Sequence, residues 1–336
     1  MNVTTTTTTA FNPALALYAK CVVAVTFALL FIGGLVTSYH AGMAVPDWPL
    51  SFGSLNPEGW WGNFPVRLEH GHRLFATGVG LLIMILCAWI FASRSTSRAV
   101  RWLVVLAFVG VVLQGTFGGL RVTLETAGNL GAAMTLRIVH GCTAQIELCL
   151  LAVIATLLSR DWIESSWKIP GQSLASVRRL AWIVVAALFC QLVLGATMRH
   201  LGAGLAIPTF PEANADGGWM PTVHNKFVDI NFSHTRLGAI VVTLLILALV
   251  ALVLRRARGE ARLTSPATGL LGLVLVQLSL GIAVIIHVKP VTLTTIHVIN
   301  GAAILALSVL LAVRASRFAK ESAPSTAQTP PPEVRA

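Results

Sequence analysis

Eight apolar runs follow one another along the chain and are separated by short polar segments. Each run has about 20 residues, enough to cross the hydrocarbon core of a bilayer as a helix. The runs show no alternation with a period of two residues, which argues against the strands of a membrane barrel. The pattern therefore predicts eight transmembrane helices, near residues 17–38, 71–93, 102–122, 136–159, 180–200, 232–254, 266–287 and 294–314.

The second half of the chain repeats the first. The segment AGMAVPDWP at 41–49 returns as AGLAIPTFP at 203–211, and the same interval of 162 residues separates His72 from His234. Because each half contains an even number of spans, both halves cross the membrane in the same direction. The expected fold is an all-α integral membrane protein whose eight transmembrane helices form two parallel-repeat four-helix bundles.

The repeat divides the chain into five parts. The threonine-rich start and the proline-rich tail are expected to be disordered, and the linker between the bundles contains a Pro–Gly break at Pro170–Gly171. The parts are a disordered N-terminus at 1–16, a first four-helix bundle at 17–159, a linker at 160–179, a second four-helix bundle at 180–314 and a disordered tail at 315–336.

Composition and charge agree with a multi-pass membrane protein and predict its orientation. Hydrophobic residues make up 55% and charged residues 11% of the chain, the mean hydropathy is +0.78 and the net charge is +11. Lysine and arginine gather in the short loops on one side, which predicts that this side and both termini are cytoplasmic. The positive charge therefore indicates orientation and anionic lipid, not nucleic acid. The predicted location is the plasma membrane, with the long loops 39–70 and 201–231 outside.

The five cysteines offer no recognisable site. All lie inside apolar runs, and none belongs to a C-x-x-C or C-x-x-C-H motif. This excludes c-type haem attachment and thiolate zinc sites. We interpret the cysteines as small buried hydrophobic residues.

A short phrase, Q-x-x-x-G, occurs three times within the spans. Glycine lets two helices approach closely, and a glutamine amide can hydrogen-bond across their interface. We therefore interpret the phrase as a helix-packing device. Its copies are Gln114 with Gly118, Gln191 with Gly195, and Gln277 with Gly281.

Four of the nine histidines, His72, His140, His234 and His297, stand at the predicted outer start of an even-numbered span. An ionisable residue there usually faces the protein interior, and neutral imidazole is a common metal ligand. Two facing imidazoles suit the axial positions of a haem better than zinc, which takes four ligands. We predict haem-sized sites at His72 with His140 and at His234 with His297, with haem toward the outer face. Hydrogen-bonded packing residues are the alternative. Of the other five histidines, four are interpreted as loop or interface residues, and His70 is expected to point away from the face of His72.

Four arginines lie within five residues of these histidines, on the side that should be poor in them: Arg67, Arg73, Arg137 and Arg236. Two interpretations are open. The arginines are partners of haem propionates, because a guanidinium pairs well with a carboxylate. Alternatively, they extend to water or to lipid phosphate.

The halves differ at an acidic position. Glu69 precedes His72 by three residues, which places both side chains on one helix face, whereas the second half has Asn231 at the matching position. A desolvated carboxyl group can act as an acid or a base. We predict a catalytic role for Glu69, with a structural pair to Arg73 as the alternative. Asp47 is likewise replaced, by Thr209.

On these residues the chain resembles the haem A synthase family. The shared features are GMAVPDWP in the first long loop, E-x-x-H-R at Glu69–Arg73, a histidine that opens each later even-numbered span, and the duplicated eight-helix plan. The resemblance covers residues 17–314. It implies an oxidoreductase that oxidises a methyl group of haem O to the formyl group of haem A for cytochrome oxidase biogenesis.

The resemblance also implies roles for individual residues. Glu69 is the catalytic carboxylate, His72 and His140 are ligands of the substrate haem, and His234 and His297 are ligands of a retained haem B. The expected partners are haem O as substrate, the lipid bilayer, haem O synthase, an electron acceptor and further copies of the chain, with no nucleic acid.

The chain departs from the family pattern at two places. Part of the family carries a cysteine pair around the PDWP loop, where this chain has Val45 and Ser51. In the second half, Thr235 separates His234 from Arg236, which puts the propionate role of Arg236 in question.

Two other functions are weighed against the enzyme. A di-haem electron-transfer cytochrome explains the four histidines but not the difference between Glu69 and Asn231. A transporter built on parallel repeats would need a polar cluster near the bilayer midplane, and the sequence offers little there beyond the three glutamines.

Overall fold

The computed structural model describes residues 10–93, 95–169, 173–214 and 216–321. Within these ranges, eight helical segments are long and apolar enough to cross a membrane, which confirms that prediction. Seven are continuous α-helices: α1 (Pro13–Ser38), α2 (Phe64–Ala92), α3 (Arg98–Thr126), α4 (Leu130–Leu157), α6 (Ala175–His200), α9 (Ala261–Ile286) and α10 (Val291–Glu321). The remaining span joins α7 (Lys226–Phe232), a π-helical turn η2 (Ser233–Gly238) and α8 (Ala239–Arg256).

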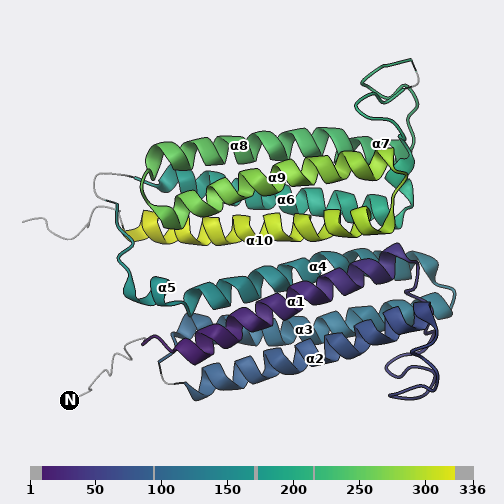
Figure 1. Cartoon of the computed structure of the whole chain (residues 1–336), viewed down its shortest axis with the longest axis horizontal. Helices are drawn as coiled ribbons and strands as arrows, with labels where there is room; N and C mark the ends of the chain where they lie inside the picture. Colours follow the sequence, from purple (N-terminus) through teal and green to yellow (C-terminus); the bar gives the residue numbers. More distant parts are fainter. Residues whose placement is uncertain (1–9, 94, 170–172, 215, 322–336) are drawn as a thin grey trace, which may run out of the picture.

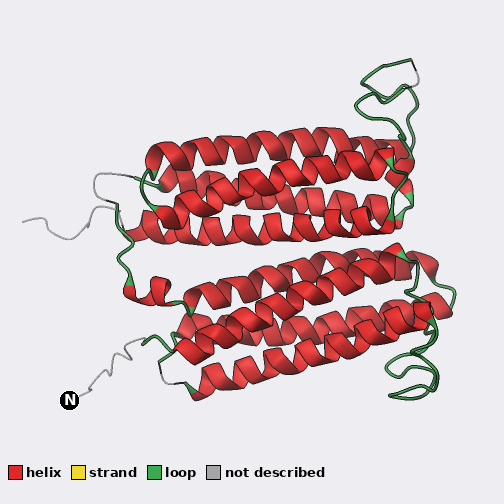
Figure 2. Cartoon of the chain, viewed as in Figure 1, coloured by secondary structure: helices red, strands yellow, loops and turns green. Residues whose placement is uncertain are grey.

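The spans gather in two groups of four (Figure 1). Helices α1 to α4 lie together, and α6, α8, α9 and α10 lie beside them, with α1 and α4 contacting α10 across the boundary. Both long loops project from the same end of the molecule (Figure 2). We call this the loop end, and the opposite end, where α1 begins and α10 finishes, the terminal end. The domain boundaries and the repeat itself stay predictions.

Asparagine caps mark the starts of three helices in the first group. The side-chain oxygens of Asn12, Asn63 and Asn129 accept hydrogen bonds from backbone N–H groups in the first turns of α1, α2 and α4. Such caps satisfy donors that have no partner inside the helix. Proline follows the cap closely in α1 and α2, where its missing N–H costs little. Polar residues beside the apolar runs therefore determine where these helices begin.

Several helices extend beyond the apolar runs. Helix α1 begins at Pro13 and α10 continues to Glu321, so residues 13–16 and 315–321 are helical, not disordered as expected. Phe318 is buried there against Trp167 of the linker. Hydrophobicity marks only the part of a helix that lies in hydrocarbon, whereas backbone hydrogen bonding continues beyond it. Residues 1–9, 322–336 and Pro170–Gly171, which also carry expectations, lie outside the described residues.

The apolar cores of both groups lie toward the terminal end. Leu15, Ile83 and Leu86 are buried in the first core, and Val253 and Leu270 in the second. The linker, which includes the short helix α5 (Arg160–Glu164), packs against the second core through the fully buried Trp167. The terminal end is therefore the tightly packed apolar part of the molecule, and the candidate histidines lie toward the loop end.

Candidate functional site

Each of the four predicted ligand histidines lies against a glycine of the preceding span. A Cβ atom added at these glycines would lie between 2.5 and 3.4 Å from the Cε1 atom of the histidine ring. At Gly195 the added atom would clash with the ring, whereas at the other three glycines it would make a tight or ordinary contact, so glycine is required most strictly at Gly195. We call each of these contacts a glycine seat. The pairs are Gly33 with His72, Gly118 with His140, Gly195 with His234, and Gly281 with His297.

The glutamines of the Q-x-x-x-G phrase contact three of the same histidines. As predicted, these glutamines lie between packed helices. The residue that each glutamine contacts on the neighbouring helix is a candidate haem ligand. Because a glutamine lies one helical turn before its glycine, the two residues hold one histidine from adjacent turns. With its amide oriented to satisfy its neighbours, Gln114 contacts His140 Nδ1 through its nitrogen (2.9 Å). Gln191 Nε2 donates to the His234 carbonyl (2.8 Å), and Gln277 Nε2 lies 3.2 Å from His297 Nε2.

The four rings fall into two pairs at the loop end. His72 interacts electrostatically with His140, and His297 with His234. Within the described part of the chain, the buried Nδ1 atoms of His72 and His297 have no hydrogen-bond partner. Such nitrogens are costly unless another group binds them or fills the space beside them.

The donor set fits a haem better than a bare metal ion. In the described residues, no group of three His, Cys, Asp or Glu side chains could hold a metal ion. A haem supplies four nitrogens of its own and needs two axial ligands from the protein. Paired imidazoles on glycine seats meet that need. The haem-ligand role of the four histidines stays a prediction.

Glu69 is buried and held by two hydrogen bonds and a second ion pair. Its Oε2 accepts from the backbone N–H of Val45 (2.9 Å), and its Oε1 lies 2.9 Å from Arg73 Nη2 and 3.6 Å from Arg121 Nη2. Only 2% of Glu69 is exposed. A buried carboxylate needs such charged partners to offset its removal from water. The first loop, α2 and α3 together therefore fix the orientation of this carboxyl group.

The same carboxyl group begins a series of alternating charges toward the surface. Arg121 also lies 3.7 Å from Glu125, and Glu125 is paired with Arg137. Side-chain exposure rises from 3% at Glu69 to 30% at Arg137. In the second group, Asn231 instead donates to a backbone carbonyl of the second loop (2.9 Å). The two halves therefore differ in a network of charges, not in a single residue.

Two candidate propionate partners hold the long loops in the same way. The guanidinium groups of Arg73 and Arg236 donate to backbone carbonyls at corresponding positions of the first and second loop. Much of their donor capacity is thus used by the protein. The bonds run from Arg73 to the carbonyls of Asp47 (2.7 Å) and Leu50 (3.0 Å), and from Arg236 to those of Thr209 (2.7 Å) and Glu212 (2.9 Å).

The other two candidates, Arg67 and Arg137, also have protein partners. Arg67 lies 5.5 Å from the ring centre of Trp61 and 5.4 Å from that of Phe64, and Arg137 pairs with Glu125. Stacking on aromatic rings and pairing with a carboxylate are both common uses of a guanidinium. Contact of the four arginines with propionates stays a prediction.

A π-helical turn accommodates the extra residue of the second motif. Thr235 separates His234 from Arg236, whereas His72 directly precedes Arg73 in the first half. A π-turn contains one more residue than the α-helical turn it replaces. With Thr235 inside η2, His234 keeps its glycine seat and Arg236 keeps its loop carbonyls. The departure seen in the sequence therefore does not displace Arg236.

Deletion of Thr235 is expected to preserve the second histidine pair, because it converts η2 to the α-helical register of the first half. Deletion of Ile240 in α8 is the matched control. It rotates the two sides of the helix relative to each other by about 100°, which should abolish stable folding or haem binding. Thermal unfolding and the absorption spectrum of bound haem measure both effects. Equal losses in the two deletions would contradict this account of η2.

The part of the chain that carries this site matches a known protein family. Residues 64–309 match the model of the family described as cytochrome oxidase assembly protein. The matched segment covers more than half of the chain and includes Glu69 and all four candidate ligand histidines. The chain belongs to this family.

Relatives named haem A synthase align with most of the chain. One from Bradyrhizobium sp. (strain ORS 278) is 29% identical over 304 residues, which cover 86% of this chain and 77% of the relative. One from Bacillus cereus (strain 03BB102) is 26% identical over 308 residues, covering 90% and 94%. A third, from Halalkalibacterium halodurans, is 26% identical over 225 residues, covering 66% and 70%.

In this member of the cytochrome oxidase assembly family, hydrogen bonds hold the first loop at the two positions considered for a cysteine pair. The carbonyl of Val45 accepts from Arg73 (2.9 Å), and the hydroxyl of Ser51 lies 2.8 Å from Nδ1 of His70. His70 is buried and packs edge-on against Trp60, with ring centres 4.7 Å apart. His70, expected from sequence only to point away from the face of His72, therefore helps to hold the loop.

Asp47 stabilises the same loop by an interaction that depends on pH. Its carboxylate accepts from the backbone N–H groups of Phe52 (2.7 Å) and Gly53 (2.8 Å). Burial would raise the pKa of Asp47, but these hydrogen bonds and the charge of Arg73 outweigh it and lower the pKa. Because the pKa of Asp47 is lower in the folded loop than in the unfolded chain, its carboxylate stabilises the loop at pH values above the usual aspartate pKa. This stabilisation is lost as the pH falls through the pKa of the folded state.

The Asp47→Asn variant is therefore expected to lose this acid-dependent loosening of the loop. Limited proteolysis of the first loop, measured as a function of pH, reports the effect. Glu58→Gln, which changes an exposed acid of the same loop, should keep the wild-type profile. An unchanged profile in Asp47→Asn would show that another group controls the loop.

Several polar residues near the site were missed in the sequence. Arg199 of α6 donates to the carbonyl of Gly34 (3.1 Å) and the hydroxyl of Ser38 (2.7 Å), both in α1. It thus joins the two helix groups. Arginine at the predicted outer ends of spans, where positive charge is disfavoured, was the signal that could have found it. The missed residues are Arg121, Glu125, Arg199 and His200, which interacts electrostatically with Arg121, Arg137 and His140.

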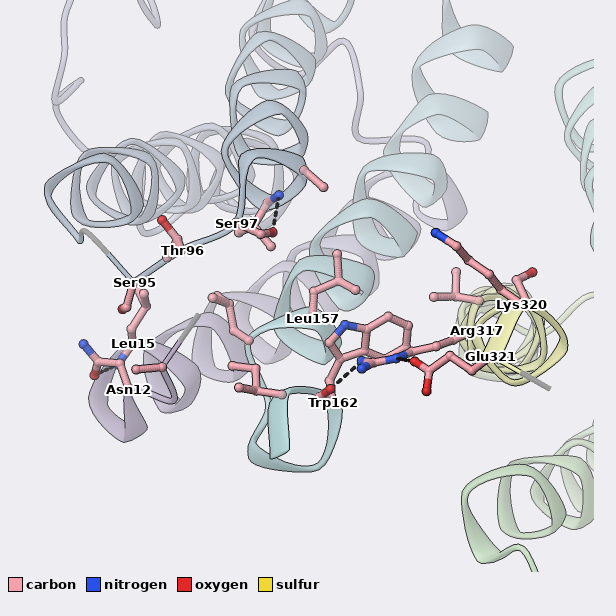
Figure 3. Close-up of a pocket in the computed structure, with 17 residues that line it drawn as sticks. Asn12, Leu15, Ser95, Thr96, Ser97, Leu157, Trp162, Arg317, Lys320 and Glu321 are labelled. Carbon is pink, nitrogen blue, oxygen red and sulfur yellow. Dashed lines mark hydrogen bonds and ion pairs between the residues drawn. The ribbon is translucent and has the colours of Figure 1, made fainter. Parts of the chain in front are cut away.

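A cavity of about 530 Å³ lies at the terminal end, away from the histidines (Figure 3). Its lining includes Asn12 at the start of α1, Trp162 of α5 and Arg317 of α10. Arg317 donates to the Trp162 carbonyl and pairs with Glu321. None of the candidate histidines lines this cavity, so it is separate from the candidate site of this family member.

Proposed function

We propose that the chain is a haem A synthase, an oxidoreductase that converts one methyl group of haem O to the formyl group of haem A for cytochrome oxidase biogenesis. Relatives of that name align with most of the chain. The proposal rests on the buried Glu69, which lies on α2 together with His72. Its carboxyl group is held between the guanidinium groups of Arg73 and Arg121. A di-haem carrier of electrons has no need for that acid.

In the first site, His72 and His140 are proposed to hold the substrate haem. Glu69 lies one helical turn from His72, in an orientation fixed by Val45, Arg73 and Arg121. Oxidation of a methyl group removes protons and electrons, and a positioned carboxylate can accept a proton or stabilise positive charge that develops nearby. Glu69 is the group of this chain best placed for that role.

The first loop covers the site from the loop end. The ring of Trp48 packs on α3 at Gly119, immediately after the glycine seat of His140. Arg73 and Thr126 bind loop carbonyls from below, at Asp47 and Pro46. A loop held in this way excludes water from a reactive centre.

In the second site, His234 and His297 are proposed to hold a resident haem B, which supplies one-electron transfer when bound. Gln191 and Gln277 fix the positions of these two histidines. Asn231 replaces the acid of the first site and binds the loop backbone instead. The second site is therefore suited to hold a haem without acting on it.

The proposed setting is the plasma membrane, with both termini cytoplasmic and the haem sites toward the outer face. The eight apolar spans support a multi-pass protein. Basic residues in the loops of the terminal end support the orientation. Haem O synthase, an electron acceptor and further copies of the chain are the proposed partners within the bilayer.

Identification of the extracted haems tests the proposal. The protein is expressed with a source of haem O, purified, and its non-covalent haems are extracted and identified by mass. Haem A or its hydroxylated precursor is expected beside haem B. Haem B alone, with haem O unchanged, would reject the enzyme and favour the second candidate, a di-haem electron-transfer cytochrome, which the four paired histidines would still explain.

A further inference from the structure

A second buried acid lies deeper in the first group. Glu147 of α4 is 7% exposed, and among the described residues its Oε1 has no hydrogen-bond partner. It stands seven residues after His140, two turns along the same helix face and about 10 Å toward the terminal end. A carboxyl group without a counter-ion at such a depth is costly as an anion, so the neutral acid is the stable form. Residues of this kind usually have a function.

Helix α3 provides a niche for this acid. A Cβ atom added at Gly110 would overlap Oε2 of Glu147 and lie 3.2 Å from its Cδ. The carboxyl group therefore lies directly on the backbone of α3, in space that any other residue would fill. The combination of an acid on α4 with a glycine opposite it matches the way His140 is seated on Gly118.

Polar side chains also lie on the α3–α4 interface between the niche and the first histidine pair. Gln114 lies one turn beyond Gly110 on α3, and its amide contacts Thr143 Oγ1 (2.6 Å) and His140 Nδ1 (2.9 Å). Thr143 lies one turn from Glu147 on α4. The interface of α3 and α4 thus carries a stripe of polar side chains from Glu147 to His140. Neither Gln114 nor Thr143 titrates, which leaves Glu147 as the proton-binding group at the inner end of this stripe.

The second group repeats the stripe but not the acid. Asn300 donates to Gln277 (2.8 Å), and Gln277 contacts His297, as Thr143, Gln114 and His140 do in the first group. In the second half, the position that corresponds to Glu147, at the same distance after the histidine, is Ile304. The position that corresponds to Gly110, at the same distance before the glutamine, is Leu273. Acid and niche are therefore both confined to the half that also holds Glu69.

We propose that Glu147 is a proton-exchanging acid that serves the first haem site; the inference rests on the proposed function for its context. When the site gains positive charge by losing an electron, the Oε–H bond of Glu147 breaks and its proton passes to water. When the electron is restored, the carboxylate binds a proton again. The electron passes to or from the one-electron redox partner of the haem, and in the test to an added chemical oxidant or reductant.

Redox-difference infrared spectroscopy of the haem-loaded protein tests this coupling. Oxidation should diminish a carboxylic C=O band, and Glu147→Gln should lack that change while its haem absorption stays normal. Turnover of Glu147→Gln should fall by a factor of about 10². A wild-type turnover, or an infrared difference identical to wild type, would overturn the proposal. The infrared change does not require haem A formation, so the proposed function can fail while this coupling stands.

A second readout needs no haem. A hydrophobic carbodiimide, which reacts with protonated carboxyl groups in membranes, should label Glu147 in the full-length protein, and peptide mass analysis locates the label. Gly110→Leu introduces the second-group residue into the niche and should displace the acid and lower turnover like Glu147→Gln. Gly115→Ala, on α3 with no atom within 4 Å of the added Cβ, is the control and should behave as wild type. Absence of label in wild type would contradict a protonated Glu147.

Discussion

Replacing Glu69 with glutamine is expected to stop haem A formation while both haem sites stay filled. Glutamine keeps the side-chain size and one acceptor oxygen, for either Val45 or Arg73, but it removes the charge and the proton-binding group. Acid–base catalysis by a positioned side chain is worth a factor of about 10²–10⁴ in rate, and turnover should fall by that factor. The measurements are the ratio of haem A to haem O in extracts and the absorption spectrum of the bound haem.

Glu58→Gln is the matched control, because Glu58 is an exposed acid in the loop that precedes α2. It should make haem A at the wild-type rate. Normal haem A formation by the Glu69→Gln variant would show that the buried carboxyl group is structural. That outcome would leave the charge series through Arg121, Glu125 and Arg137 as a device that only stabilises the loop end.

Replacing His234 with alanine should remove the haem of the second site and leave the first site occupied. If His234 and His297 are the two axial ligands, as proposed, the variant keeps only the imidazole of His297, which by itself cannot hold a haem in a six-coordinate, low-spin state. Stable haem B should disappear from extracts, and its low-spin absorption should disappear from the purified protein. Retention of both signals would exclude His234 as a ligand.

Gly195→Val should have the same effect without changing a ligand. A Cβ atom at this position would lie 2.5 Å from Cε1 of His234, so valine forces the ring away. Gly272→Ala on α9 is the control, since no atom lies within 4 Å of its added Cβ. A normal haem B content in Gly195→Val would show that the glycine seat has no part in positioning the ligand.

The sequence was sufficient for the membrane helices because a single physical requirement fixes them. Backbone groups in hydrocarbon must be satisfied within the segment, so long apolar runs become helices. The ends were harder to predict. Pro13 and Phe318 lie in helices beyond the apolar runs, since capping by Asn12 and packing against Trp167 are not visible in hydropathy.

The candidate site was predicted in part. His72, His140, His234 and His297 were singled out because ionisable residues are rare in such spans, and their ligand role stays a prediction. Glu147 was overlooked, although it is also an ionisable residue inside a span, because it belongs to no repeated motif. The Q-x-x-x-G phrase was assigned to helix packing correctly, yet only the fold shows that the packing partner is a histidine.

By itself, the sequence determined the number of spans, the interval between equivalent residues and the substitution of Glu69 by Asn231, because hydrophobicity and repetition are properties of the chain. The tertiary structure alone decided what each polar group contacts. It showed that Arg73 and Arg121 contact Glu69 and that each of the four candidate histidines packs against a glycine. It also showed that η2 keeps Arg236 in contact with the second loop. Contacts between helices depend on crossing geometry and close approach, which a one-dimensional pattern does not contain.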